Sequence, residues 1–154
     1  MEIALKYKNG LLGAAALLLA TAAGATDGLV ELKSPRDARE TMNRVEEGVK
    51  QRGLNVFARI DHAAGAAMAG KTLRPTELLI FGNPQGGTPL MECAQTAGID
   101  LPLKALVWQD AAGQVWLGYN DPAWIARRHG AGDCPATDIL RKALDGIAAA
   151  AVVP

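Results

Sequence analysis

The chain has 154 residues, enough for one domain but too short for two of ordinary size. Hydrophobic residues make up 49% of it, which provides for an ordinary core, and 16 basic residues balance 16 acidic ones. This balance argues against a nucleic-acid partner, since no basic stripe is available to hold phosphates. The inventory also argues against a serine hydrolase, because we expect the only serine, Ser34, to cap a helix.

The first 25 residues are typical of a secretory signal peptide. Lys6 and Lys8 form a positive start, and the apolar run 11–20 is about half the ~20 residues that a membrane span needs. Small residues at 23–25 suit a signal peptidase, and the alternative is an uncleaved anchor. We therefore expect cleavage near Ala25, a periplasmic or secreted protein, and no stable membrane span after cleavage.

The mature chain opens with a short strand over 30–32, followed by a helix. Ser34 is the expected cap, with Pro35 in the first turn and Asp37 placed as in a capping box. Gly53 ends the helix. Four apolar residues at helical spacing predict one buried stripe: Ala38, Met42, Val45 and Val49.

Strands and short helices alternate through the middle of the chain. Residues 54–61 alternate as a half-buried strand does, and 62–70 predict a short helix. The apolar run 78–81 predicts a central strand, which Gly82-Asn83-Pro84 breaks. A further short helix is expected to start at Thr88-Pro89 and to end by Gly98.

A hairpin and two helices complete the chain. Strands over 103–109 and 114–119 flank a turn at 110–113, whose glycine can take the left-handed position. A helix capped by Asp121 ends at Gly130, and an amphipathic helix follows. This order favours an α+β domain in which helices cover one face of a mainly antiparallel sheet. We assign the domain to residues 28–132 and a C-terminal helical extension to residues 133–154.

Four motifs together resemble one family between Leu29 and Gly130. They read ELLIFGNPQGGTPLM, DLPLKALVWQD, GQVWLGYNDP and ARRHG. Their pattern is similar to that of the family known as domain of unknown function 302. The resemblance implies a curved antiparallel sheet in a TATA-binding-protein-like β-α-β arrangement, and a homodimer, without implying DNA binding. It supplies no reaction, catalytic residue, metal or cofactor. The residues that fit the family's recurring polar pattern are His62, Asn83, Lys104, Trp108, Tyr119, Asn120 and His129.

The two histidines, His62 and His129, each follow charged residues. A hydrolase- or lyase-like enzyme would use them as acid and base, with Lys104 as an electrostatic stabiliser. The structural alternative has His129 interact with the C-terminal carbonyls of its helix, while His62 satisfies a turn. Lys104 shares a strand face with Trp108, so its stem could instead cover apolar surface. Two histidines alone do not predict a metal site.

Cys93 and Cys134 are the only cysteines, and an even count in an exported chain favours a disulfide. The alternatives are metal or redox handling together with a histidine, and two inert thiols. The leading interpretation is a non-enzymatic module that binds a small ligand or a protein partner. Its site would lie at the strand ends near Asn83, Lys104, Tyr119 and His129, and no cofactor is expected.

Overall fold

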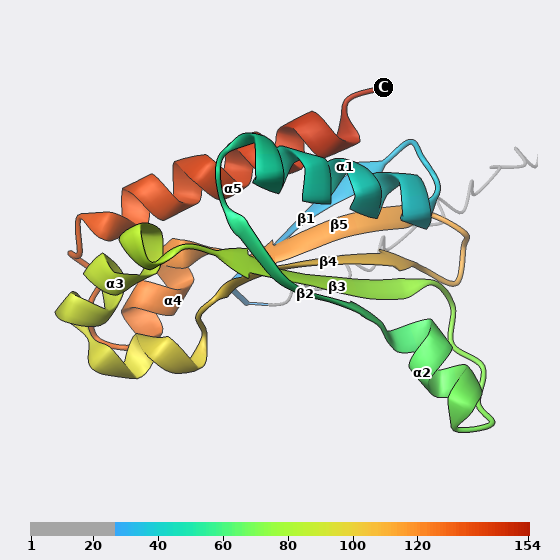
Figure 1. Cartoon of the computed structure of the whole chain (residues 1–154), viewed down its shortest axis with the longest axis horizontal. Coiled ribbons are helices and arrows are strands. Elements are labelled where there is room, and N and C mark those ends of the chain that lie inside the picture. The colour runs from blue at the N-terminus through green and yellow to red at the C-terminus, as the bar shows by residue number, and fades with distance from the viewer. Residues whose placement is uncertain (1–26) are drawn as a thin grey trace, which may run out of the picture.

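Five antiparallel strands form one open sheet in the order β1-β5-β4-β3-β2 (Figure 1). The structure is a computed structural model that describes residues 27–154. The strands are β1 (Leu29–Ser34), β2 (Asn55–Asp61), β3 (Thr76–Gly82), β4 (Leu103–Gln109) and β5 (Val115–Asn120). The helices are α1 (Ala38–Gln51), α2 (His62–Met68), α3 (Pro84–Cys93), the 3-10 helix η1 (Gln95–Ile99), α4 (Pro122–Arg128) and α5 (Ala136–Val152). The expected α+β class with a mainly antiparallel sheet is confirmed.

The core lies between one face of the sheet and the helices α1 and α5, which run across that face (Figure 1). Alternate residues of the strands point toward these helices, as strand geometry requires. The predicted stripe of α1 is confirmed at Met42, Val45 and Val49, all of which are fully buried. The helix α5 docks on the same core through Leu140, Leu144 and Ile147. The buried strand residues include Leu79, Phe81, Leu103, Val107, Leu117 and Tyr119.

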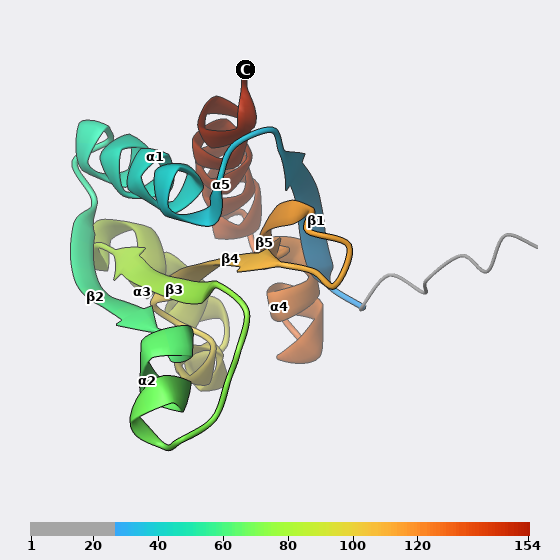
Figure 2. The same ribbon diagram turned by 90° about the vertical axis from the view of Figure 1, so that its right-hand side faces the viewer.

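Neither α1 nor α5 covers the opposite face of the sheet (Figure 2). Trp108 of β4 pairs in register with Trp116 of β5, and their rings stack with centroids 6.3 Å apart. The ammonium of Lys33 lies 5.4 Å from the Trp116 ring, a cation–π contact. We call this surface the open face. Its other apolar residues include Ile60, Leu78, Ile80 and Leu106.

Two predicted helix starts are wrong by three or four residues. Asp37, not Ser34, caps α1, because its carboxylate accepts the backbone N–H of Glu40 at 2.8 Å. Ser34 instead ends β1, and its buried hydroxyl lies 2.7 Å from that of Thr41. The helix α3 begins at Pro84 rather than at Thr88, since Asn83 and Pro84 form a cap and a first helical residue, not a break.

Gly98 does not end α3, because that helix ends at Cys93 and Gly98 lies inside the separate 3-10 helix η1. Three further local signals are placed as predicted. Asp121 caps α4, Gly130 takes a left-handed φ of 71°, and Gly113 takes a φ of 85° in the β4–β5 turn. Cys93, at the end of α3, lies at disulfide distance from Cys134, with Cα atoms 6.1 Å apart. The bond connects α3 to the segment that precedes α5. The predicted signal peptide lies outside the described residues, and no helix within residues 27–154 is long and apolar enough to cross a membrane.

Candidate functional site

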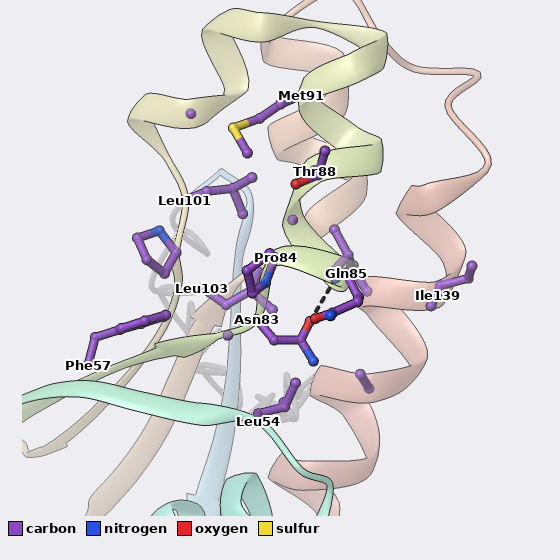
Figure 3. A pocket seen from close by; sticks show the side chains of 17 residues that line it. Leu54, Phe57, Asn83, Pro84, Gln85, Thr88, Met91, Leu101, Leu103 and Ile139 are labelled. Atoms are coloured by element: carbon purple, nitrogen blue, oxygen red, sulfur yellow. Dashed lines mark hydrogen bonds between the residues drawn. The ribbon is translucent and has the colours of Figure 1, made fainter.

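A cleft of about 580 Å³ opens between α3, η1, α5 and the adjoining ends of β2 and β3 (Figure 3). We call it the α3–α5 cleft. It forms because β3 ends at Gly82 and Asn83-Pro84 turns the chain directly into α3. Gly86 and Gly87, in the first turn of α3, leave room beside this turn because they carry no side chain. The large apolar side chains of the wall include Leu54, Phe57, Met91, Leu101, Ile139 and Leu140.

The mouth of the cleft is apolar as well. Phe57 of β2 is 56% exposed and Ile139 of α5 is 69% exposed, and they lie on opposite sides of the cleft (Figure 3). Exposed large apolar side chains that border a concavity mark a surface suited to an apolar ligand.

Polar side chains are few in this cleft. Among the described residues that line it none is charged, and the polar ones are Asn83, Gln85 and Thr88. Gln85 and Thr88 are exposed, whereas Asn83 is half-buried. Asn83 Oδ1 accepts the backbone N–H of Gly86 at 2.7 Å (Figure 3), and this bond fixes the orientation of the amide.

Three other predicted site residues border a second, smaller cavity. Lys104, Tyr119 and Asn120 lie around a space of about 200 Å³ beside α4. Lys104 Nζ donates to the carbonyls of Asp100 at 2.9 Å and Pro102 at 2.8 Å, so two of its three donors hold the chain between η1 and β4. Burial lowers the pKa of the Lys104 ammonium, and the nearby charge of Asp100 opposes this effect.

Tyr119 directs its hydroxyl to the helical side of the sheet. The hydroxyl donates to Asp145 Oδ1 of α5 at 2.5 Å. Burial first, and then this hydrogen bond, raise the pKa of Tyr119 above its usual value. The phenol therefore connects β5 to α5 and is not directed toward Lys104.

His129 forms a polar cluster with Thr96, Asp100 and Arg128, which we call the His129 cluster. Its Nε2 lies 2.7 Å from Asp100 Oδ2, and its Nδ1 lies 3.0 Å from Thr96 Oγ1. Arg128 donates to the same carboxylate at 2.9 Å. The His129 side chain thus bonds to residues in and just after η1, in place of the expected contact with the carbonyls of its own helix.

The remaining predicted residues lie elsewhere. His62 begins α2, which lies beyond the opposite end of the sheet from α4 (Figures 1 and 2). Trp108 stacks on Trp116 in the open face. The indole N–H of Trp116 donates to Asp110 at 2.8 Å, and this bond is the largest cause of the lowered pKa of that carboxyl. The structure therefore places Asn83 in the cleft, His62 in α2 and Trp108 in the open face, whereas the small cavity and the His129 cluster adjoin each other at Asp100.

The cysteines do not gather a metal-binding set around them. Both thiols belong to the Cys93–Cys134 pair, and residues 27–154 contain no group of three or more histidine, cysteine, aspartate or glutamate side chains placed to hold a metal ion. A coordinating thiolate would first require reduction of the pair.

Sequence reasoning missed Thr96 and Asp100, and it also missed the apolar wall of the cleft. Asp100 opens the DLPLKALVWQD motif, so its place in that motif was the available signal. Phe57 and Ile139 occupy outward positions of a strand and a helix, where a single exposed apolar residue is ordinary. Their meeting at one cleft depends on contacts between distant parts of the chain.

Known proteins resemble both the sequence and the fold. The profile described as "Domain of unknown function DUF302" matches residues 30–150, which include most of α5. The chain is 52% identical over 117 residues to the fluoride-specific ion channel FluC 1 of Brucella suis biovar 1 (strain 1330), covering 76% of this chain and 45% of that protein. The same identity and length relate it to FluC 1 of Brucella abortus biovar 1 (strain 9-941), of which 43% is covered.

The chain thus spans less than half the length of these curated relatives. The crystal structure of an uncharacterized conserved protein DUF302 from Bacillus stearothermophilus has the same fold, with a TM-score of 0.74 and 20% identity. That alignment covers 82% of this chain and 99% of the other. With its profile match across 30–150 and its antiparallel sheet covered on one face by α1 and α5, the chain belongs to the DUF302 family.

Proposed function

We propose that this domain binds a small, mainly apolar molecule in the α3–α5 cleft. The observation that carries the proposal is the cleft itself, about 580 Å³ in volume, with an apolar wall and an apolar mouth. Small-molecule sites in proteins are typically concavities of roughly 300–1,000 Å³ lined by apolar side chains with a few polar groups. A ligand here would cover exposed apolar surface. Each Å² of that surface removed from water stabilises the complex by about 25 cal/mol.

Two replacements of alanine by phenylalanine on α5, one inside the cleft and one outside it, test this proposal. Ala143 lines the cleft on α5, whereas Ala149 is exposed on the same helix outside the lining. The probe is N-phenyl-1-naphthylamine, whose fluorescence rises in apolar sites. We expect wild type and Ala149→Phe to bind it alike, and Ala143→Phe to bind at least tenfold more weakly. Equal binding by all three, with unchanged melting temperatures, would remove the cleft as the site.

We also propose that the protein acts outside the cytoplasm. The support is the signal-like sequence of residues 1–25 and the Cys93–Cys134 pair, since disulfides persist in oxidising compartments. Mass spectrometry of the protein from a periplasmic fraction should give a chain that begins near Thr26 and lacks two thiol hydrogens. An intact Met1 in cytosolic protein would end this proposal.

A homodimer, which the family resemblance implied, is proposed to pair through the open face. Ile60 is 38% exposed beside Leu78, and contiguous apolar surface is uncommon on monomers. Light scattering during gel filtration should give twice the chain mass for wild type, and Ile60→Glu should shift it toward the monomer. A wild-type protein that stays monomeric at high concentration would contradict the proposal.

The His129 cluster favours a second candidate function, hydrolysis. His129 lies between the Thr96 hydroxyl and the Asp100 carboxylate, the order of partners that activates a hydroxyl nucleophile. His129 would accept the Thr96 proton, and Asp100 would stabilise the imidazolium. Release of nitrophenol from p-nitrophenyl butyrate tests this. Wild type should exceed both Thr96→Val and His129→Gln, and equal rates in all three would end the candidate.

The relatives named as fluoride channels add one partner to test. Because a stretch 52% identical to this chain occupies less than half of those proteins, we propose that the domain works beside a channel of that kind. Deleting the matched 117 residues from the Brucella suis relative should alter its fluoride efflux from liposomes. Unchanged efflux and assembly would contradict an accessory role.

A further inference from the structure

We propose that the ligand of the α3–α5 cleft is an uncharged hydrophobic molecule that presents a hydrogen-bond acceptor to the side-chain amide of Asn83. This inference rests on the proposed ligand-binding function and names the chemical class of the ligand.

The first argument is the absence of charge from the cleft wall. None of the described lining residues is Asp, Glu, Lys, Arg or His. A carboxylate, phosphate or ammonium that entered the cleft would lose its hydration and find no counter-ion, which is strongly unfavourable. A neutral molecule avoids this cost and gains from contact with side chains such as Leu101 and Leu140.

The second argument concerns the two N–H donors of the Asn83 amide. The Gly86 N–H requires an acceptor, so the atom 2.7 Å from it is Oδ1, and the opposite atom of the amide is Nδ2. No described residue accepts a hydrogen bond from Nδ2. Because Asn83 is half-buried while Gln85 and Thr88 are exposed, its amide is the polar group that a bound ligand would cover most completely.

A covered N–H without a partner opposes binding, and an acceptor on the ligand removes that penalty. A carbonyl or ether oxygen supplies the acceptor without bringing a charge. A Cβ on Gly86 would lie 3.1 Å from Asn83 Oδ1 and 3.7 Å from Leu140 Cδ2, so the glycine leaves space on the oxygen side of the amide, next to α5.

Three compounds of matched shape separate these contributions. Benzylacetone is a ketone, butylbenzene is the corresponding hydrocarbon, and 3-phenylpropionate replaces the methyl ketone by a carboxylate. Each is titrated against the protein loaded with N-phenyl-1-naphthylamine, and displacement of the probe gives its affinity. For wild type we expect both neutral compounds to displace the probe and the carboxylate to bind most weakly.

The variant Asn83→Asp isolates the amide donor. Its carboxylate can still accept the Gly86 N–H and cap α3, but it has no N–H to offer a ligand. The affinity ratio of ketone to hydrocarbon should fall about three- to tenfold relative to wild type, which corresponds to one hydrogen bond. Thr88→Val removes an exposed hydroxyl of the same cleft and should leave the ratio unchanged.

The outcomes distinguish this inference from the function on which it rests. Tightest binding by the carboxylate, or a ratio unaltered by Asn83→Asp, overturns the inference while leaving the cleft as a binding site. Binding that Ala143→Phe fails to weaken overturns the proposed function itself. If Asn83→Asp does not fold, as judged by circular dichroism, the ranking of the three compounds on wild type still decides whether a charged ligand is preferred.

Discussion

The imidazole of His129 and the carboxylate of Asp100 lie 2.7 Å apart and join the end of α4 to the segment that follows η1. The His129 side chain is only 9% exposed and that of Asp100 12%. Because η1 and the residues after it form part of the cleft wall, this contact helps to set the shape of the cleft from outside it.

Asp100→Asn should lower the free energy of unfolding by about 1–3 kcal/mol, since it weakens charge-assisted hydrogen bonds to His129 and Arg128. Urea denaturation followed by circular dichroism measures the change. Asp138→Asn is the control, because Asp138 forms an exposed pair with Arg141 that contributes about 0–1 kcal/mol. Equal midpoints for the two variants would show that the Asp100 cluster adds no stability.

The ion pairs of Glu46 should make the domain sensitive to acid. A hydrogen bond from Lys50 is the largest cause that lowers the pKa of Glu46 below its usual value of 4.5, and a hydrogen bond from Arg59 is the next. A carboxyl with a lowered folded-state pKa contributes stability that is complete above the unfolded-state value and is lost as the pH falls through the folded-state value. Glu46→Gln should therefore be less stable than wild type at neutral pH, and the two should converge in acid.

Thermal unfolding across this pH range checks that prediction. Glu47→Gln is the matched control, because Glu47 is the next residue of α1 and accepts a hydrogen bond from the neutral amide of Gln51. It removes a carboxylate from the same turn of α1 and leaves the ion pairs of Glu46 in place. A gap between wild type and Glu46→Gln that stays constant into acid would contradict the linkage.

Reduction of the Cys93–Cys134 pair should destabilise the domain. The two cysteines are separated by 41 residues, and closing such a loop contributes about 3–4 kcal/mol in the chain-entropy model. Dithiothreitol should lower the urea midpoint of wild type and leave that of the Cys93→Ala/Cys134→Ala variant where it is. Identical midpoints for wild type with and without reductant would show that the bond is absent or does not stabilise.

Two glycines should respond in opposite ways to alanine. A Cβ on Gly118 would lie 2.9 Å from Trp108 Cζ3 and 3.3 Å from the carbonyl oxygen of Val30, so Gly118→Ala should cost about 1–3 kcal/mol through overpacking. Gly65 lies in α2 with nothing within 4 Å of such a Cβ. Gly65→Ala should therefore be neutral or stabilise by up to about 1 kcal/mol. Denaturation of the two variants compares them, and a stable Gly118→Ala protein would refute the close packing.

Much of the fold could be predicted because its signals are local. The cap at Asp121 and the turn that ends in Gly113 each depend on residues within one turn of the chain. The start of α1 was misplaced because Ser34 and Asp37 are both good capping residues three positions apart, and packing of Ser34 against Thr41 decides between them. This contact joins residues seven positions apart, and the rules for helix caps consider only the first turn of the helix.

The candidate site was harder to predict because it depends on register and on the placement of helices. Lys104 and Asn120 meet because β4 and β5 are antiparallel neighbours, whereas Trp108, only four residues after Lys104, lies toward the other end of the same strand. A search for polar residues also directed attention away from the cleft, whose wall is mainly apolar. Only Asn83 belongs to both the predicted set and the cleft.

The position of β1 has a consequence for synthesis of the chain. This first strand pairs only with β5, which is the last strand in chain order. Leu29 therefore lies opposite Asn120. While the ribosome is still making the middle of the domain, β1 has no native neighbour, and its backbone groups remain exposed to any strand they meet. The three strand pairings from β2 to β5 can form in order as the strands emerge, but the sheet acquires its last edge only when β5 has been made.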